Sequence, residues 1–529
     1  MSDLDSFAFS DEGPWQLPDG PLPWQSGVAE LRAATQAEVP RLVGRKRLPP
    51  LRRFLEAGGL VCWALLRWWL GGRRRGGETS RADLSRRLRI VFERLGPTYI
   101  KLGQIVSSGK GLFPDELVEE FKRCRDRVAP EPFETVRRVV EADFGAPLES
   151  VFREFDEQCL ASASIAQVHA AVLATGESVV VKVQRESVSR LVHRDVRAMA
   201  WIAPFLVGRL PIAALANPPA LVELFAETIS EELDFRLEAE NMLDVARVLR
   251  AAGQSAVVVP RPHPRWVTPR VIVMERLDGF RYEDVDGMQA AGIDTTAVLR
   301  SLLISFLEGA MIYGVFHGDL HGGNLFVLPS GRVALLDYGI TGRMREPERL
   351  AFLRMMMTGA ANDIPGQLAA FRDLGALPPD VDLDTLAGVL KLDRPTLDPT
   401  KLSGEQLVAE IQDVLKGLLA HGARMPKHLM LYVKNFLFID GAIATLAPDI
   451  DLFAEVTRIY GYFVANHADK IARDIGFDPR AVQLDVDGLR RGLGLDDDVE
   501  AVSHRELQQR RKDVQEKLEK TVRSPSDLV

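Results

Sequence analysis

Residues 317–339, HGDLHGGNLFVLPSGRVALLDYG, constrain the fold of this chain more than any other stretch. The apolar runs LFVL and VALL flank a Pro-Ser-Gly-Arg turn, and this pattern predicts a short β-hairpin. Asp319 and Asn324 precede the hairpin, and Asp337 follows it. Because a hairpin folds the chain back on itself, we expect these three side chains to surround one cleft.

Oxygen-bearing side chains at this spacing suit metal-dependent phosphoryl transfer, which needs a carboxylate near the attacking group and oxygen ligands for Mg²⁺. The Asp319-x-x-x-x-Asn324 spacing resembles the kinase catalytic loop, and Asp337 opens a DYG triplet close to the kinase DFG. We therefore assign Asp319 as the catalytic carboxylate and Asn324 and Asp337 as metal ligands. The simpler alternative is a polar surface loop whose acids cap helices or turns.

A lysine that holds the nucleotide phosphates, fixed by a glutamate on a neighbouring helix, is the second requirement. Lys182 lies in SVVVKVQR, the second of two β-branched segments joined by a turn at 175–177. A charge within a strand is costly to bury without a partner, and downstream EELDFRLEAEN offers Glu232, Asp234 and Glu238. An edge-strand lysine facing water is the alternative, but the order of the motifs favours the nucleotide role.

The loop ASASIAQVH precedes these strands, where a kinase has its glycine-rich loop. Alanine resists the positive φ angles that glycine adopts, so this loop should be stiffer than a glycine-rich one. Taken alone, it would be an ordinary Ala/Ser-rich turn. We expect nucleotide contacts from this loop and from the end of the VIVMERL segment: Ala161, Ser162, Ala163, Ser164, Ile165, Met274, Glu275 and Leu277.

With these motifs in order, the chain resembles the UbiB/ABC1 (AarF, ADCK) family of atypical kinases. The segment GPTYIKLGQIVSS, at 96–108, is similar to the family's KxGQ signature. The resemblance covers roughly residues 84–446 and implies an α+β, protein-kinase-like two-lobed fold with an N-terminal helical KxGQ extension and a mostly helical C-terminal lobe. It also implies an atypical kinase or ATPase that binds ATP or ADP with Mg²⁺ and supports isoprenoid quinone or related lipid metabolism.

In that family the KxGQ helix folds over the active site, and its lysine and glutamine point into the cleft. Lys101 and Gln104 stand three residues apart, so they share one helix face. The resemblance gives Lys101 a catalytic role and implies two ion pairs: Lys101 with Glu232 or Asp234, and Lys182 with Glu238. A helix in the cleft would obstruct a peptide, so phosphorylation of proteins in trans is the less expected activity.

Two positions depart from the family pattern. Gly322 stands where the family loop HxDxHPGN has proline, which should loosen the backbone without removing a ligand. Tyr338 replaces the Phe of DFG and should leave Asp337 free to bind metal. Many members end in two transmembrane helices, and we expect none at this C-terminus.

Residues 59–70, GLVCWALLRWWL, come nearest to a membrane segment in the sequence. The run is shorter than the roughly 18 to 20 apolar residues of a spanning helix. Its tryptophans, Trp63, Trp68 and Trp69, are flanked by arginines at 52–53 and 73–75, which suits either a membrane-interface segment or a helix packed on the main domain. We expect a cytoplasmic protein, peripheral at the inner face of the membrane in the first case.

Charge and cysteine content exclude other classes. A net charge of -8 and a pI near 5.8 argue against a nucleic-acid partner. Cys62, Cys124 and Cys159 are scattered without CxxC spacing, so neither a disulfide framework nor a zinc site is expected. Residues 1–30 lack the pattern of a secretory signal. The expected partners are a nucleotide, a lipid surface and quinone-biosynthesis enzymes, and the oligomeric state stays open.

The change from helical to strand periodicity and back, together with what the family resemblance implies, gives six expected segments. They are 1–50, acidic, Pro-rich and poorly ordered; 51–80, apolar and basic; 84–150, the helical KxGQ subdomain; 151–277, a kinase-like N-lobe; 278–475, a kinase-like C-lobe; and 476–529, a charged C-terminal extension. Within them we expect a turn near 113–114, one long helix over 219–250 and only helices beyond about residue 346.

Two other functions fit part of the pattern. A small-molecule phosphotransferase of the aminoglycoside or choline kinase type also uses an HGDxHxxN loop, but it lacks a KxGQ helix and a DYG-like triplet. A nucleotide-gated scaffold would use ATP to change shape without significant turnover. Intact Asp319, Asn324 and Asp337 weigh against a dead site, yet they do not separate slow turnover from binding.

Overall fold

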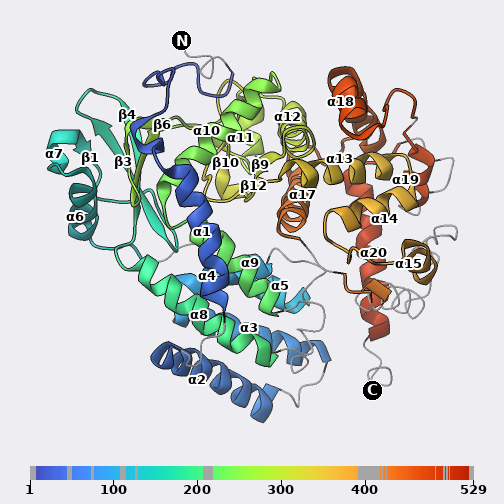
Figure 1. The fold of residues 1–529 in the computed structure, drawn as a ribbon, viewed down its shortest axis with the longest axis horizontal. Coiled ribbons are helices and arrows are strands. Elements are labelled where there is room, and N and C mark those ends of the chain that lie inside the picture. The colour runs from blue at the N-terminus through green and yellow to red at the C-terminus, as the bar shows by residue number, and fades with distance from the viewer. Residues whose placement is uncertain are drawn as a thin grey trace. The chain divides into compact units, whose positions relative to one another are not determined.

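Figure 1 shows the computed structural model as a ribbon. The chain divides into two compact units. Unit 1 comprises Met1–Arg247, Val258–Asp278 and Leu336–Ile340, and unit 2 comprises Val248–Val257, Gly279–Leu335 and Thr341–Val529. The structure describes residues 7–44, 50–72, 77–107, 115–124, 129–206, 218–390, 417–418, 421–423, 426–482, 484–492, 495, 499 and 501–522.

The helices of unit 1 surround an apolar core in which Val196, Phe225 and Ile229 are fully buried. Their bounds are η1 Pro23–Gln25, α1 Val28–Val43, α2 Leu51–Arg67, η2 Trp68–Gly72, α3 Gly77–Leu95, α4 Pro97–Ser107, α5 Asp115–Phe121, α6 Phe133–Phe144, α7 Leu148–Val151, α8 Val188–Leu206, α9 Pro218–Glu231 and α10 Phe235–Ala251. The turn expected near 113–114 lies outside the described residues.

A six-stranded antiparallel sheet completes unit 1, in the order β1-β3-β4-β7-β6 with β2 paired to β3. The strands are β1 Phe152–Phe155, β2 Ala161–Ser162, β3 Ala166–Leu173, β4 Ser178–Gln184, β6 Pro262–Val267 and β7 Val271–Glu275. Val179, Val181 and Val183 of β4 are buried in the core beneath α6. Because side chains alternate along a strand, Lys182 projects from the opposite face.

Unit 2 holds a four-stranded sheet, β5-β11-β10-β8, and a two-stranded sheet, β12-β9. The strands are β5 Val257–Val258, β8 Phe280–Arg281, β9 Val315–His317, β10 Leu325–Val327, β11 Val333–Leu335 and β12 Thr341–Arg343. The helices are α11 Val285–Ala290, α12 Thr295–Glu308, η5 Gly309–Tyr313, η6 Gly322–Asn324, α13 Glu346–Ala360, α14 Ile364–Asp373, α15 Leu383–Val389, α17 Lys427–Leu446, α18 Leu452–Ile475, α19 Val486–Gly492 and α20 His504–Val522.

The predicted hairpin is confirmed: β10 and β11 pair antiparallel with Phe326 opposite Ala334. The turn between them contains Gly331 at φ 80°, a conformation that glycine adopts without strain. Among the described residues, the elements that follow β12 in the chain are helices, from α13 to α20, as the sequence predicts.

The expectation of a poorly ordered N-terminal segment is wrong for residues 7–44. Phe9, Leu17 and Trp24 are buried, and the Arg261 guanidinium donates to the carbonyls of Ser10 (2.5 Å) and Trp15 (2.8 Å). The proline-rich, acidic composition gave no indication of these contacts. A few apolar side chains are buried against unit 1, and they order the segment.

The single helix expected over 219–250 is also wrong, because α9 and α10 are separate helices. Residues 232–234 break the run, and the Asp234 carboxylate accepts the backbone N–H of Arg236 at 3.1 Å. Aspartate often bonds backbone groups in this way and so competes with the helix. Strand β1 and helix α8 had no counterpart in the prediction.

Two helical segments of unit 2 are apolar and long enough to cross a bilayer by composition alone. They are Thr295–Tyr313, with mean hydropathy 1.4 and 61% buried, and Lys427–Leu446, with mean hydropathy 1.5 and 39% buried. The expectation that 59–70 comes nearest to a span is therefore wrong by this measure, because single charges such as Arg300 hide these helices from a search for unbroken apolar runs. Arg300 pairs with Glu455 at 2.5 Å, a contact typical of a helix packed inside a protein.

Candidate functional site

Lys182 lies between two carboxylates of unit 1. Its Nζ is 2.7 Å from Oε1 of Glu238, in the first turn of α10, and 3.1 Å from Oδ1 of Asp337. The Lys182 and Glu238 side chains are 14% and 3% exposed, whereas that of Asp337 is 50% exposed. The expected pairing of Lys182 with Glu238 is confirmed, and the half-exposed Asp337 carboxylate remains accessible to a ligand.

The electrostatics of this pair favour a permanently charged lysine. Burial alone would lower the pKa of Lys182, but the negative charges of Asp337 and Glu238 outweigh it and the net pKa is raised. Burial raises the pKa of Glu238, opposed by the charge of Lys182. The ammonium therefore stays protonated at neutral pH, as a phosphate-binding group must.

The turn that carries Asp337 is held by a hydrogen bond from α10, and the same residue of α10 is bonded by α1. Asp337 has φ 58°, an uncommon value for a residue other than glycine, and its Oδ1 accepts the Gly339 N–H at 3.1 Å. The buried Asn241 of α10 donates to the Tyr338 carbonyl at 2.8 Å and accepts from Arg32 of α1 at 3.0 Å. These bonds connect the conformation at Asp337 to α10 and α1.

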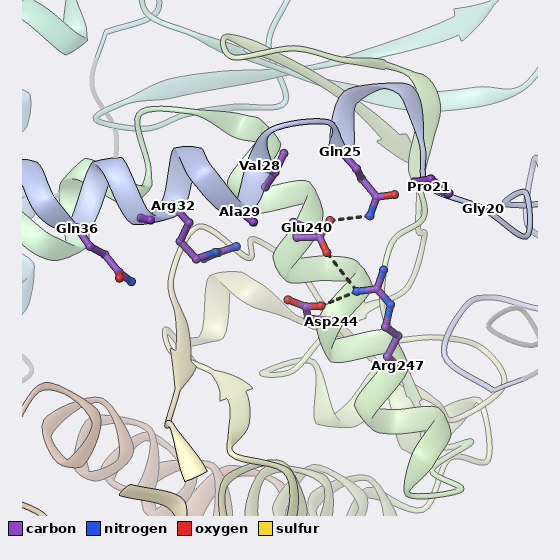
Figure 2. Close-up of a pocket in the computed structure, with 11 residues that line it drawn as sticks. Gly20, Pro21, Gln25, Val28, Ala29, Arg32, Gln36, Glu240, Asp244 and Arg247 are labelled. Atoms are coloured by element: carbon purple, nitrogen blue, oxygen red, sulfur yellow. Dashed lines mark hydrogen bonds and ion pairs between the residues drawn. The ribbon is translucent and has the colours of Figure 1, made fainter. Parts of the chain in front are cut away.

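A pocket of about 690 Å³ is lined by residues of α1 and α10 (Figure 2). Within it, Arg247 bonds Glu240 at 3.2 Å and Asp244 at 2.5 Å, and Gln25 bonds Glu240 at 2.7 Å. Because these polar groups bond one another, we assign the pocket no ligand. These contacts show that α1 and the turn before it support α10, the helix that carries Glu238.

The KxGQ helix, α4, reaches the same region of unit 1 through an ion pair. Lys101 Nζ lies 2.9 Å from Oε1 of Glu232, with both side chains largely buried. Asp234 instead pairs with Arg236 at 2.8 Å. Of the two partners expected for Lys101, the structure thus selects Glu232, while its catalytic role stays a prediction, as does the regulatory role of the half-buried Gln104.

Gly103 of the KxGQ motif has a packing role. A Cβ at this position would lie 2.9 Å from Cδ1 of Phe121 and 3.2 Å from Sγ of Cys124, closer than van der Waals contact allows. Glycine is therefore needed for α4 to pack against α5. This contact fixes the helix that carries Lys101.

Arg185 fastens the Ala/Ser-rich loop, a role that the sequence did not suggest. Its Nε donates to the Ala163 carbonyl at 3.0 Å, its Nη2 to Ser162 Oγ at 2.8 Å, and its backbone N–H to the Ile165 carbonyl at 2.9 Å. Arg185 is buried, and burial lowers its pKa. The loop is thus bound to a fixed cation, which gives the expected stiffness a second cause; nucleotide contact by residues 161–165 stays a prediction.

The end of β7 gives weaker support to a nucleotide role. The Glu275 carboxylate bonds the Ser10 hydroxyl and the Arg261 N–H, and the Glu275 N–H donates to the Arg261 carbonyl. The carboxylate and the backbone N–H of Glu275 are thus both bonded within the protein, so a nucleotide contact by this residue stays a prediction. Contacts from Met274, which is buried, and Leu277, which is half-buried, stay predictions.

The HGDLHGGN loop belongs to unit 2 and is closed by its own hydrogen bonds. The Asp319 N–H donates to Nδ1 of His317 at 3.1 Å, and Nδ2 of Asn324 donates to the Asp319 carbonyl at 3.1 Å. These bonds fix Asp319 and Asn324 relative to each other. Their chemical roles stay predictions.

Helix α17 contributes two residues to this loop that the sequence reasoning missed. Lys434 forms an ion pair with the Asp319 carboxylate. The fully buried Asn435 accepts the Leu320 N–H at 2.9 Å and donates to the His317 carbonyl. The available signal was a lone Lys-Asn pair within the otherwise apolar LMLYVKNFLFI.

Gly322, which stands in place of the family's proline, is required by its neighbours. A Cβ there would lie 2.2 Å from Cε1 of Tyr282 and 2.6 Å from Oε1 of Glu283. Tyr282 therefore occupies the space that a proline ring would need. The replacement of proline by Gly322 is therefore matched by the neighbouring Tyr282 side chain. Its effect is not limited to a more flexible backbone.

Asp337 suits a metal that is held jointly with a nucleotide. Mg²⁺ is usually bound through one or two carboxylates together with substrate phosphates and water. Among the described residues, no group of three or more His, Cys, Asp or Glu side chains is arranged to hold a metal. The half-exposed Asp337 carboxylate fits the first arrangement, whereas the described residues do not form an all-protein cage.

Comparisons with known proteins define the family. Residues 123–367 match the ABC1 atypical kinase-like domain. An uncharacterized protein of Mycobacterium tuberculosis is 34% identical over 398 residues, which cover 73% of this chain and 78% of that protein. This chain belongs to the ABC1 atypical kinase-like family and has its α+β, protein-kinase-like fold.

Two named relatives extend the comparison. A probable protein kinase UbiB of Marinobacter nauticus is 30% identical over 389 residues, covering 71% of this chain and 69% of that protein. An uncharacterized aarF domain-containing protein kinase of Arabidopsis thaliana, described as chloroplastic, is 30% identical over 394 residues, covering 70% and 73%.

Proposed function

We propose that this protein is an ATP-dependent phosphotransferase or ATPase that binds a Mg-nucleotide through Lys182 and Asp337. One observation carries the proposal: a largely buried, charge-compensated ammonium lies 3.1 Å from a half-exposed carboxylate. Phosphoryl transfer needs a cation on the phosphates and a carboxylate on the metal. Membership of a kinase-like family supports the same activity.

Each residue has a distinct part in this proposal. Lys182 binds the nucleotide phosphates and Glu238 fixes its position, while Asp337 holds Mg²⁺, which neutralises charge on the phosphates when bound. Asp319 and Asn324 act as catalytic carboxylate and second metal ligand on the strength of their motif. Lys434 forms an ion pair with the Asp319 carboxylate and so holds it in place.

The acceptor is proposed to be something other than a peptide. The ion pair between Lys101 and Glu232 keeps the KxGQ helix fixed in unit 1, and in this family that helix takes the place of a protein substrate. The resemblance to UbiB/ABC1 proteins supports a role in isoprenoid quinone or related lipid metabolism, with quinone-biosynthesis enzymes as partners. ATP and ADP are both candidates for the nucleotide.

Turnover and binding, measured separately, test the proposal. Phosphate release and autophosphorylation are followed with Mg-ATP and Mg-ADP, and binding is followed as a nucleotide-induced shift in melting temperature. We expect Asp319→Asn to retain the shift and lose turnover by about 100-fold or more. We expect Lys101→Ala to retain the shift and to change nucleotide preference or autophosphorylation.

The exposed Asp19 provides a matched control, Asp19→Asn, which should behave as the parent. A parent protein that shows the nucleotide-induced shift and no turnover under any condition would be a nucleotide-gated scaffold. A parent protein without the shift would contradict nucleotide binding altogether.

A further inference from the structure

Helix α2 and the η2 turn that continues it expose an apolar face. Its large side chains are between 46% and 65% exposed and follow helical spacing: Leu51, Leu55, Trp63, Leu66, Trp69 and Leu70. We call these six residues the α2 outer face. A contiguous exposed apolar surface marks a site of association with a protein or a membrane.

The fold fixes this face outward. Ala57 and Ala64, on the other side of α2, are buried in the helical core of unit 1. Arg53 pairs with the fully buried Asp195 at 2.5 Å. Figure 1 shows α2 beside α3 and α8, which it contacts. Turning the outer face inward would break a buried ion pair, so its exposure follows from the packing.

In the sequence, the segment that contains α2 has a charge opposite to that of the whole chain, although Arg81 and Arg89 of α3 pair with Glu116 and Glu120 of α5. Residues 41–95 contain fifteen basic and four acidic residues, a net charge of +11, whereas the chain carries -8. Arg52 and Arg67 are exposed on α2, and the Arg67 guanidinium lies 4.9 Å from the centre of the Trp63 ring. Glu56, the acidic residue of α2, pairs with Arg53 at 3.0 Å. A partner that complements this face has an apolar interior for the leucines and tryptophans and an anionic surface for the arginines.

We propose that the α2 outer face docks on the surface of an anionic lipid bilayer, with α2 parallel to the membrane plane. Tryptophan favours the headgroup region, leucine the acyl boundary beneath it, and arginine extends to lipid phosphates. The sequence left open an interfacial segment or a packed helix. In this proposal α2 is both, because its inner face packs on unit 1 and its outer face meets lipid. The proposal does not depend on nucleotide chemistry.

Vesicle sedimentation with the full chain and no nucleotide tests this docking. We expect the protein to bind vesicles of phosphatidylcholine with about 30% phosphatidylglycerol at least tenfold more tightly than pure phosphatidylcholine, with binding weakened by salt. The triple variant Trp63→Ser, Leu66→Ser, Trp69→Ser should lose at least tenfold in partitioning. Arg52→Gln and Arg67→Gln should each lose roughly fivefold on anionic vesicles alone.

Helix α17 provides the matched control, because Val433, Phe436 and Leu437 are also exposed there. Changing all three to Ser should leave vesicle binding as in the parent. Loss of binding in this variant, or full binding by a folded α2 triple variant, overturns the proposal.

A replacement variant and a test for self-association complete the experiment. If the α2 triple variant does not fold by circular dichroism, Leu51→Ser with Leu55→Ser, one turn apart on the same face, replaces it. A parent that dimerises through the α2 outer face in lipid-free solution and ignores vesicles would show that a second copy is the partner, and it would overturn the proposal.

Discussion

Replacing Glu238 with Gln should destabilise unit 1 far more than a surface change does. Glu238 is nearly fully buried and lies 2.7 Å from the Lys182 ammonium. Removing one partner of a buried ion pair typically costs about 3 to 5 kcal/mol, because the other charge is left uncompensated. Asp337 still pairs with Lys182 at 3.1 Å, so we expect a smaller loss, about 2 kcal/mol.

Urea unfolding monitored by tryptophan fluorescence measures this loss, because all seven tryptophans of the chain lie in unit 1. The control Glu223→Gln changes an exposed glutamate of α9 and should stay within about 0.5 kcal/mol of the parent. The double variant Lys182→Met, Glu238→Leu removes both charges of the pair and should unfold within about 1 kcal/mol of the parent, while losing nucleotide binding.

A cost for Glu238→Gln no larger than that of Glu223→Gln would refute the reasoning, since Lys182 would then not depend on its buried partner. A double variant less stable than Glu238→Gln would also refute it. In that case the methionine and leucine would not have replaced the pair.

Three further predictions concern packing and pH. Gly103→Ala should destabilise unit 1 by about 1 to 3 kcal/mol in the same urea assay, because its Cβ would lie 2.9 Å from Phe121; an unchanged midpoint would contradict the packing. Gly322→Pro should lower the melting temperature followed by circular dichroism, with partial recovery when Tyr282→Ala makes room, and no recovery would exclude that clash. Burial lowers the pKa of His263 to about 4, below its unfolded value of about 6.5. The folded state therefore binds fewer protons in this interval, and roughly 3 kcal/mol of stability, complete above pH 6.5, should be lost as the pH falls towards 4. His263→Gln should remove this dependence in urea unfolding, and an unchanged slope would contradict it.

Local patterns predicted the parts of the fold that depend on neighbouring residues. The hairpin followed from its turn residues, and the strand of Lys182 followed from its β-branched composition. The pairs that Lys182 and Lys101 make came from family order, which encodes long-range contacts that spacing alone does not reveal.

Tertiary contacts decided what the sequence did not predict. The local sequence suggested no role for Arg185, because its bonds to the Ala/Ser-rich loop depend on how β2 folds back on β3. Lys434 contacts Asp319 from a helix far along the chain. In the N-terminal segment, a few buried apolar residues contact the rest of unit 1. The many acidic and proline residues around them hide this signal in the composition.

The most direct test of the central claim is calorimetric titration of ATP into the parent and Asp337→Asn proteins, with and without Mg²⁺. The parent should bind more tightly with Mg²⁺ than without, while Asp337→Asn should show little difference between the two conditions. Magnesium-dependent affinity in Asp337→Asn equal to that of the parent would contradict the assignment of Asp337 as the metal ligand beside Lys182.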